Sequence, residues 1–523
     1  MIKNVLIGIG GTGSRVIESV VHLCAAGLGP DKLHIFMIDP DQGNGNLTRT
    51  KTLIKKYTEL RQKFQRTGKN NSFKTEIIIP PGDEPFIWSI FEERDYNLAK
   101  FINYDNTAKQ WPEIADLANI LFTEKELTTP LNEGFRGHPS IGAVVMADPP
   151  MNKYPFKMLW DGIESMGKND LRVFIVGSIF GGTGAAGFPT LGSRQLIKFN
   201  EAMHASLGGE NSRVLLGGAL VLPYFSFAVD HTRSQTDSMF VTTSDFPIAT
   251  KAALQYYNDK ELGFDNYYFI GDSLAQQVGE FSVGSSTQEN KPHYIEMVSA
   301  LAGFDFFEQA SGSSGDEKKY FLASRETEKI DWSVLPLTRI SANLTDQRRK
   351  FKSAVSDFTI FAYTYLTYGK KELKMSHKDV SIQPWYSDNF KRDYKEESPL
   401  YNPRHSQNSD LYAVADDYLN SFLFWISSMD DKEKVALIDS EKLTRGAITS
   451  TKKLDLIDPE ENRGNIGQVI KGESKHLDFN AFRAGDGLQD AIINNNTISA
   501  GSKYLNIFYD AAARFNSKNL VNN

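Results

Sequence analysis

Two glycine-rich segments have the residue types and spacing that bind phosphate groups. Gly8-Ile9-Gly10-Gly11-Thr12-Gly13 satisfies the pattern G-x-G-x-x-G, and Gly181-Gly182-Thr183-Gly184 forms a second loop of this kind. Glycines allow a tight turn and let backbone N–H groups approach phosphate oxygens, and the N-terminus of a following helix adds about half a positive charge. A dinucleotide needs one such loop for its pyrophosphate, so two loops favour a triphosphate held from two sides.

The elements around these loops follow the order of an α/β protein. Residues 2–9 predict a buried strand, residues 14–26 a helix and residues 33–38 a second strand, which together form a βαβ unit. The alternation resumes near residue 171, with strands predicted at 172–177, 214–222 and 266–270, and helices at 190–207, 248–262 and from Pro292 onward. We therefore expect an α/β fold with a Rossmann-like parallel sheet.

Two parts of the chain depart from this alternation. Residues 42–133 are polar, charged and aromatic with patchy helical spacing, which predicts a largely helical insertion. Residues 311–315 read as a linker, helical patterns follow at 346–368 and 411–428, and residues 490–502 predict a loop. We expect a nucleotide-binding domain over residues 1–310 and a mainly helical, divergent C-terminal region over residues 311–523.

Composition excludes several classes of protein. The chain has 523 residues, 40% hydrophobic and 24% charged, which fits several folded domains rather than a disordered protein. A net charge of −7 argues against a globally basic nucleic-acid binder. The single cysteine, Cys24, cannot form an internal disulfide or a thiolate metal cage, so we expect a cytoplasmic location. No signal peptide or membrane segment is expected, and neither H-E-x-x-H nor a P-loop lysine occurs.

Five segments, in order, resemble motifs of the tubulin/FtsZ superfamily. The segment from Gly181 to Ala186 resembles the signature G-G-G-T-G-[ST]-G, with Phe180 in place of the first glycine. The others are 10–13, similar to the first phosphate loop; 38–42, similar to the second; 134–142, similar to the γ-phosphate loop G-x-G-x-x-P-x-x-G; and 221–227, similar to a strand and ribose loop. The resemblance covers about residues 1–310 and implies GTP or GDP with Mg²⁺ as ligands.

The resemblance also implies roles for individual residues. Backbone groups of both glycine loops would hold the α- and β-phosphates, Arg136 and Gly137 would lie at the γ-phosphate, and Pro223 would lie at the ribose. Asp39 and Asp41 would contact ribose or Mg²⁺, or else cap the following segment. The residues expected to bind nucleotide are Gly10, Gly11, Thr12, Gly13, Asp39, Asp41, Arg136, Gly137, Gly181, Gly182, Thr183, Gly184, Pro223, Asn290 and Glu296.

Three of these positions leave alternatives open. Thr183 is either a phosphate ligand or a helix cap, and Arg136, which replaces the second glycine of its motif, is either a phosphate ligand or a solvated loop residue. The helix that begins near Pro292 resembles the family's central helix, which carries a base-reading Asn or Asp. Asn290 and Glu296 are the candidates; Glu296 departs from the family pattern, and Asn290 would serve equally well as a helix cap.

Hydrolysis would need a group that orients water against the γ-phosphate. In polymer-forming relatives this group comes from the next subunit, and the nearest match here is Asn343 with Asp346, one residue longer than the family spacing. A helix cap explains the same two residues.

Three functions remain in competition. The first is a GTP-binding protein that assembles head to tail into filaments or oligomers, with nucleotide at the subunit interface and with GTP hydrolysis. The second is a nucleotide-dependent switch that does not polymerise, whose insertion or C-terminal region contacts an unknown protein partner. The third is an NAD(P)-binding oxidoreductase, since the G-x-G-x-x-G loop and Asp39 also suit a dinucleotide.

Overall fold

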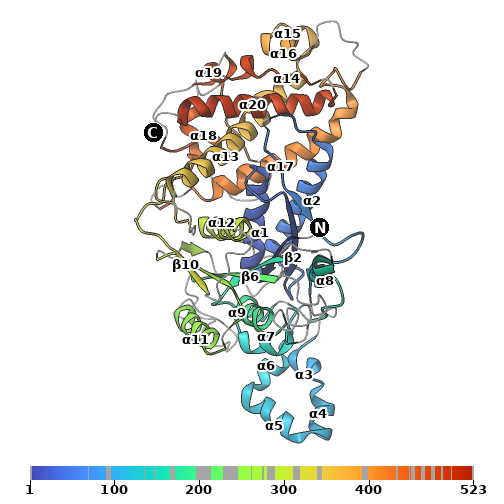
Figure 1. Cartoon of the computed structure of the whole chain (residues 1–523), viewed down its shortest axis with the longest axis vertical. Coiled ribbons are helices and arrows are strands. Elements are labelled where there is room, and N and C mark those ends of the chain that lie inside the picture. The colour runs from blue at the N-terminus through green and yellow to red at the C-terminus, as the bar shows by residue number, and fades with distance from the viewer. Residues whose placement is uncertain are drawn as a thin grey trace.

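The computed structural model has a parallel sheet at its centre, a helical arm at one end and a helical C-terminal region at the other (Figure 1). It describes residues 3–520 except 69, 90–95, 133, 136, 148, 165–170, 196–213, 228–244, 261, 274–275, 279–288, 310–317, 338–343, 391–397, 431–433, 447, 449–453, 461–465, 473–477, 485–486 and 496. Among these residues no helix is long and apolar enough to cross a membrane.

The central sheet is entirely parallel, as predicted, and its strand order is β10-β8-β6-β5-β1-β2-β3, with β4 also paired to β2. Its strands are β1 (Asn4–Ile9), β2 (Lys32–Ile38), β3 (Glu76–Ile78), β4 (Ile87–Trp88), β5 (Leu171–Ser178), β6 (Val214–Val221), β8 (Asn266–Ile270) and β10 (Lys319–Ala323). A separate parallel pair joins β7 (Phe225–Phe227) to β9 (Gln276–Val278). The apolar runs at β1, β2, β5, β6 and β8 confirm the five strands predicted from the sequence.

The strand order changes direction between β1 and β5. From β1 the chain adds β2 and β3 on one side, and from β5 it adds β6, β8 and β10 on the other. In open parallel sheets of this kind, loops leaving the two strands at the reversal diverge to opposite faces and open a crevice at the carboxyl edge. The two glycine loops follow β1 and β5, so both lie at this crevice.

Helices cover both faces of the sheet. One face carries α1 (Gly10–Ala25), α2 (Gly45–Lys63) and α12 (Tyr294–Glu308), and the other carries α7 (Pro139–Val145), α8 (Lys157–Glu164), α9 (Gly182–Pro189) and α11 (Asp245–Asp259). The helix predicted at 190–207 begins earlier, at Gly182, and passes into a π-helical segment at Thr190–Gln195. The helix predicted from Pro292 begins at Tyr294, because His293 caps it.

The insertion is largely helical, as predicted, but part of it belongs to the sheet. Helix α2 packs on α1, and β3 and β4 pair with β2. The remaining helices form the arm at the lower end of Figure 1. They are α3 (Leu98–Phe101), α4 (Tyr104–Gln110), α5 (Pro112–Leu121) and α6 (Glu124–Thr128).

The C-terminal region is mainly helical, as predicted. Its helices are α13 (Leu344–Thr364), α14 (Lys370–Lys374), α15 (His377–Ser381), α16 (Pro384–Asn389), α17 (Ser409–Ser428), α18 (Ser440–Leu443), α19 (Phe479–Arg483) and α20 (Ala500–Leu520). The loop predicted at 490–502 ends where α20 begins, and the linker predicted at 311–315 lies outside the described residues. The sheet continues past residue 310, because β10 is its edge strand.

The C-terminal region shares a hydrophobic core with the sheet domain. The ring of Trp425 in α17 stacks on His22 of α1 with 5.0 Å between centroids, and its Nε1 donates to Ser19 Oγ at 3.1 Å. Tyr418 donates its hydroxyl to the backbone oxygen of Val21 at 3.1 Å. Because these contacts are buried, α17 is anchored on the helix that follows the first glycine loop.

Candidate functional site

The two glycine loops face each other across the reversal of strand order. Helix α1 begins at Gly10 directly after β1, and α9 begins at Gly182 shortly after β5. A Cβ atom on Gly10 would lie 3.2 Å from Thr183 Cβ and 3.5 Å from the Gly184 nitrogen. Gly10 also has φ +69°, a left-handed conformation that favours glycine. The N-termini of α1 and α9 therefore lie next to each other, and the first N–H groups of each helix have no partner within that helix.

Small residues let the second helix approach its strand closely. A Cβ atom on Gly184 would lie 2.3 Å from the backbone oxygen of Ser178, so no larger residue fits there without a shift. The N-terminus of α9 is consequently held against the end of β5. Thr183 lies beside it in the first turn of α9, but the helix cap is Gly181, which has no side chain to accept a hydrogen bond from the first N–H groups. The interpretation of Thr183 as the cap is therefore wrong.

The segment expected to sense a γ-phosphate abuts the second glycine loop. A Cβ atom on Gly182 would lie 2.9 Å from the Gly137 nitrogen. Helix α7 then starts at Pro139, and His138 Nδ1 lies 3.2 Å from Glu126 Oε1 at the base of the arm. Arg136 lies outside the described residues. The structure thus brings Gly137 to the glycine loops.

The acidic loop after β2 lies on the other side of the first glycine loop. Asp39 is buried and its Oδ1 accepts from the Asp41 nitrogen at 3.1 Å, and Asp41 Oδ1 accepts from the Gly43 nitrogen at 3.0 Å. Burial raises the pKa of Asp39 to about 8. The cap of α2 is Asn44, whose Nδ2 would lie 3.7 Å from a Cβ atom on Gly11. The carboxylates therefore organise their own loop, while Asn44 is the helix cap.

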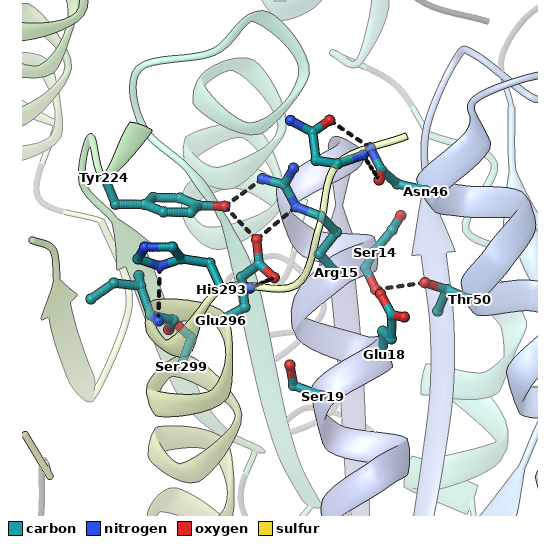
Figure 2. A network of polar contacts seen from close by, with 12 residues as sticks. Ser14, Arg15, Glu18, Ser19, Asn46, Thr50, Tyr224, His293, Glu296 and Ser299 are labelled. Atoms are coloured by element: carbon teal, nitrogen blue, oxygen red, sulfur yellow. Dashed lines mark hydrogen bonds and ion pairs between the residues drawn. The ribbon is translucent and has the colours of Figure 1, made fainter. Parts of the chain in front are cut away.

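A buried polar network joins α1, the loop after β6 and α12 (Figure 2). Glu296 Oε1 lies 2.7 Å from Arg15 Nε and accepts from the Tyr224 hydroxyl at 2.7 Å, and its Oε2 accepts from the His293 nitrogen at 3.0 Å. Arg15 also donates from Nη2 to the Tyr224 hydroxyl. Glu296 is only 1% exposed, and all three partners hold its carboxylate in place.

Asn290 lies beside this network and is paired with α2. Its backbone nitrogen donates to Asn46 Oδ1 at 2.9 Å, and its Oδ1 accepts from Asn46 Nδ2 at 3.4 Å. Arg49, which makes a bidentate ion pair with Glu18, donates to the Asn290 backbone oxygen at 2.9 Å. Since His293 caps α12, the alternative interpretation of Asn290 as that cap is wrong. Asn290 therefore precedes the cap of α12, and its side-chain amide is paired with that of Asn46.

Sequence reasoning missed four residues that complete this side of the site: Arg15, Asn46, Arg49 and Tyr224. Arg15 could have been singled out as a charged residue in the helix that directly follows the first glycine loop. In the structure it is buried, as is nearly all of α1. Tyr224 follows Pro223, which lies half-buried after β6 at the same edge of the sheet. The contacts of Arg15 with Tyr224, and of Asn46 and Arg49 with Asn290, each join residues more than 200 positions apart in the sequence.

The predicted catalytic residues lie in the C-terminal region. Asp346 is in the first turn of α13, is 48% exposed and pairs with Arg349 at 3.2 Å. Helix α13 packs against α17 and α20. Asn343 lies outside the described residues. Within the described part of the chain, no cluster of three or more His, Cys, Asp or Glu side chains forms a site for a resident metal ion.

Comparisons with known proteins return structural neighbours only. No family model and no curated protein matches the chain. Similar solved structures include three CetZ proteins, which belong to the tubulin/FtsZ family. CetZ from Methanosaeta thermophila has a TM-score of 0.25 and 11% identity, over 57% of this chain and 52% of that one.

The other two CetZ structures are from Haloferax volcanii. GDP-bound monomeric CetZ1 has a TM-score of 0.22 and 12% identity, over 52% of this chain and 51% of that one. The GTPγS-bound protofilament of CetZ2 has a TM-score of 0.26 and 12% identity, over 68% and 72%. The chain thus spans about half the length of the first two neighbours. At these TM-scores the neighbours assign no function, which has to come from the residues of this chain.

Proposed function

We propose that this chain is a tubulin/FtsZ-like protein that binds GTP or GDP with Mg²⁺ in the crevice between β1 and β5. The observation that carries the proposal is the approach of the two glycine loops, in which Gly10 faces Thr183 and Gly184. A single phosphate loop would suffice for a dinucleotide, whereas two facing loops surround a chain of phosphates. For this reason the NAD(P) oxidoreductase is the weaker alternative.

The proposed binding mode uses backbone groups more than charged side chains. N–H groups at the starts of α1 and α9 would donate to the α- and β-phosphates, and the partial positive charge of both helix ends would favour the anion. Such a site suits a chain with a net charge of −7, because it needs no cluster of lysines. Gly137, with the neighbouring Arg136, would lie toward the γ-phosphate.

Mg²⁺ would be held mainly by the phosphates. This ion keeps several waters and takes one or two carboxylates in nucleotide sites. Asp39 and Asp41 are the carboxylates in the loop beside Gly11, so they are the residues available for it. The ion would neutralise phosphate charge and would favour the ionised form of Asp39.

Self-association and hydrolysis are parts of the same proposal. A nucleotide in the crevice at one edge of the sheet would be completed by a second copy of the chain, in a head-to-tail contact that extends into a filament. In this arrangement Asp346 acts from the neighbouring subunit, which agrees with its half-exposed position on α13. We expect this protein to act in the cytoplasm.

A non-polymerising switch is the second candidate, and the position of α2 favours it. The helix begins at the acidic loop beside Gly11 and leads to residues that contact α20. The Gln65 nitrogen donates to Ser502 Oγ at 3.1 Å, and Asn506 Nδ2 donates to the Gln65 backbone oxygen at 2.9 Å. A nucleotide that reorders the loop would thereby act on the C-terminal region.

Two measurements test the proposal. The purified protein is denatured, and the released small molecules are separated by chromatography and identified by mass; GTP or GDP is expected, and NAD(P) would contradict the proposal. Right-angle light scattering and negative-stain microscopy with Mg²⁺ and GTP, compared with GDP, then distinguish a filament from a switch. Assembly in GTP alone supports the filament, and nucleotide binding without any assembly supports the switch.

A further inference from the structure

The arm at the lower end of Figure 1 carries large apolar side chains that the rest of the described chain leaves uncovered. Helix α5 buries only Ala115 and Ala118. Residues three or seven positions apart share one side of a helix, so Ile114, Leu117 and Leu121 form one stripe. We call the exposed apolar side chains of this helix and its cap the arm face; they are Trp111, Ile114, Leu117, Ile120 and Leu121.

The arm has little core of its own to balance this exposed face. Helix α4 buries none of its residues, and its Tyr104 hydroxyl donates to Asn119 Oδ1 of α5 at 2.9 Å. A helix of about ten residues is marginal in water unless its apolar side packs against something. Exposed apolar side chains gathered on one surface mark a binding site for another macromolecule. The arm face is therefore suited to a partner surface.

The arm leaves the sheet at the edge that holds the proposed nucleotide site. Strand β4 pairs with the last two residues of β2, so the chain enters the arm from the carboxyl edge of the sheet. The base of the arm is closed where the Leu131 nitrogen donates to the Tyr96 backbone oxygen at 2.9 Å. The chain then returns through Gly137, which abuts Gly182 of the second glycine loop. The arm thus extends beyond the crevice, away from the C-terminal region (Figure 1).

The opposite end of the molecule carries a second set of exposed apolar side chains. Helices α14, α15 and α16 lie at the upper end of Figure 1. Met375 follows α14, and Ile382 follows α15 and is 75% exposed. Arg404 donates to the Met375 backbone oxygen and so holds its own segment, with exposed Leu400 and Tyr401, at the end of α14. We call these four apolar residues the far-end surface.

The two ends carry opposite charges that make no ion pair within the described part of the chain. Glu113 and Asp116 are exposed on α5, each four positions before a residue of the arm face. Lys374 and Lys378 are exposed on α14 and α15, on either side of Met375 in the chain. Opposite charges around two apolar surfaces steer them together, whereas two arm faces would bring carboxylates against carboxylates. An anionic lipid surface would repel the arm face for the same reason.

We propose that the arm face of one copy of this chain binds the far-end surface of a second copy. The inference rests on the self-association in the proposed function and names the surfaces that make it. Because the two surfaces differ and lie at opposite ends of the molecule, the contact is heterologous and repeats from copy to copy. One short helix offers less than the ~800 Å² per partner of a standard interface, so a single contact is weak and assembly depends on protein concentration.

Charge reversal tests the pairing of the two surfaces. Sedimentation velocity with GTP and Mg²⁺ gives the protein concentration at which half of the chains are assembled. Glu113→Lys with Asp116→Lys, or Lys374→Glu with Lys378→Glu, should raise that concentration about tenfold or more, because like charges then meet. A chain with all of these changes should assemble like the unmodified protein, since its charges are again opposite. Such a rescue would show that the single-ended variants fold.

Removing apolar side chains tests the same contact independently. Leu117→Ser with Ile120→Ser, the arm variant, should raise the half-assembly concentration about 30-fold or more. Ile248→Ser is the matched control, because Ile248 of α11 is 72% exposed and Ile120 is 79% exposed, and it should assemble normally. Met375→Ser with Ile382→Ser, the far-end variant, should fail alone. A mixture of the arm and far-end variants should form dimers, because each variant retains one intact surface.

Several results would overturn the inference. One is normal assembly of both variants, another is normal assembly of the far-end variant alone, which would mean that the arm binds elsewhere, and a third is a mixture that stays monomeric. Loss of vesicle binding by the arm variant, with assembly unchanged, would assign the arm to a lipid surface instead.

Binding of fluorescent GTP separates this inference from the proposed function. The substituted residues lie outside both glycine loops, so every variant should bind the nucleotide like the unmodified protein. If binding is retained and the unmodified protein does not assemble, the inference and the filament are overturned and nucleotide binding stands. If the unmodified protein does not bind nucleotide, the proposed function is overturned, and the same charge-reversal series without nucleotide decides the inference.

Discussion

Replacing Gly10 by alanine should weaken nucleotide binding while leaving the fold intact. The substitution adds a methyl group 3.2 Å from Thr183 Cβ and 3.5 Å from the Gly184 nitrogen, within the gap between the two glycine loops. It also places alanine at φ +69°, which costs about 1–2 kcal/mol for a residue with a Cβ atom. The loops must then separate, and their N–H groups lose their alignment on a common anion.

The expected magnitude follows from those N–H groups. A hydrogen bond to a charged partner contributes about 1.5–3 kcal/mol, so the loss of one such bond weakens binding roughly 10- to 150-fold. Gly82→Ala is the matched control, because Gly82 has φ +62° and open space around its Cβ position. Both variants should lose similar stability in urea denaturation, but only Gly10→Ala should lose affinity for fluorescent GTP.

The affinities of the two variants can contradict this prediction. If Gly10→Ala binds nucleotide as tightly as the unmodified protein, the space between the loops is not the phosphate site. Equal losses of affinity in both variants would show that binding reports general stability instead of loop geometry.

Three further outcomes are expected. Burial raises the pKa of Asp39 from 3.8 to about 8, so without nucleotide the folded state retains a proton that the unfolded state releases. The free energy of unfolding should therefore fall by up to about 1.4 kcal/mol per pH unit from about pH 4 to 8. In urea denaturation, Asp39→Asn should flatten this dependence on pH. Trp425→Ala removes the ring stacked on His22 and should destabilise the chain by about 3–5 kcal/mol, measured in the same way. Asp346→Ala changes a half-exposed side chain and should leave stability within about 0.5 kcal/mol, while phosphate release from GTP falls; unchanged release would exclude Asp346 from hydrolysis.

The strands that could be predicted are those whose side chains are buried on both faces. β1 and β6 read as continuous apolar runs because helices cover both sides of the sheet. β10 was missed because it is an edge strand whose residues Tyr320 and Leu322 are exposed, so it lacks the signature of burial. β3 and β4 were missed because strands of three and two residues carry too little periodicity to be recognised.

The glycine loops and the acidic loop could be predicted because each is a local feature. A tight turn between a strand and a helix requires its glycines at fixed positions, whatever the rest of the chain does. The polar network of Arg15, Tyr224 and Glu296 could not be predicted in the same way. Arg15 meets Glu296 only because α1 and α12 pack on the same face of the sheet. Glu296 was predicted as a base-reading residue, and its carboxylate instead holds Arg15, Tyr224 and the start of α12.

The local chemistry of this protein can be predicted from its residues alone: two strand–glycine–helix turns, an acidic strand end, and an order of motifs similar to tubulin and FtsZ. These depend on residues close together in the chain, where backbone sterics and periodicity decide the outcome. The tertiary structure alone decided that β1 and β5 are neighbours, so that two loops form one crevice, and that Arg15, Tyr224 and Glu296 form one network. Those contacts depend on strand order and helix packing, since their partners lie far apart in the sequence.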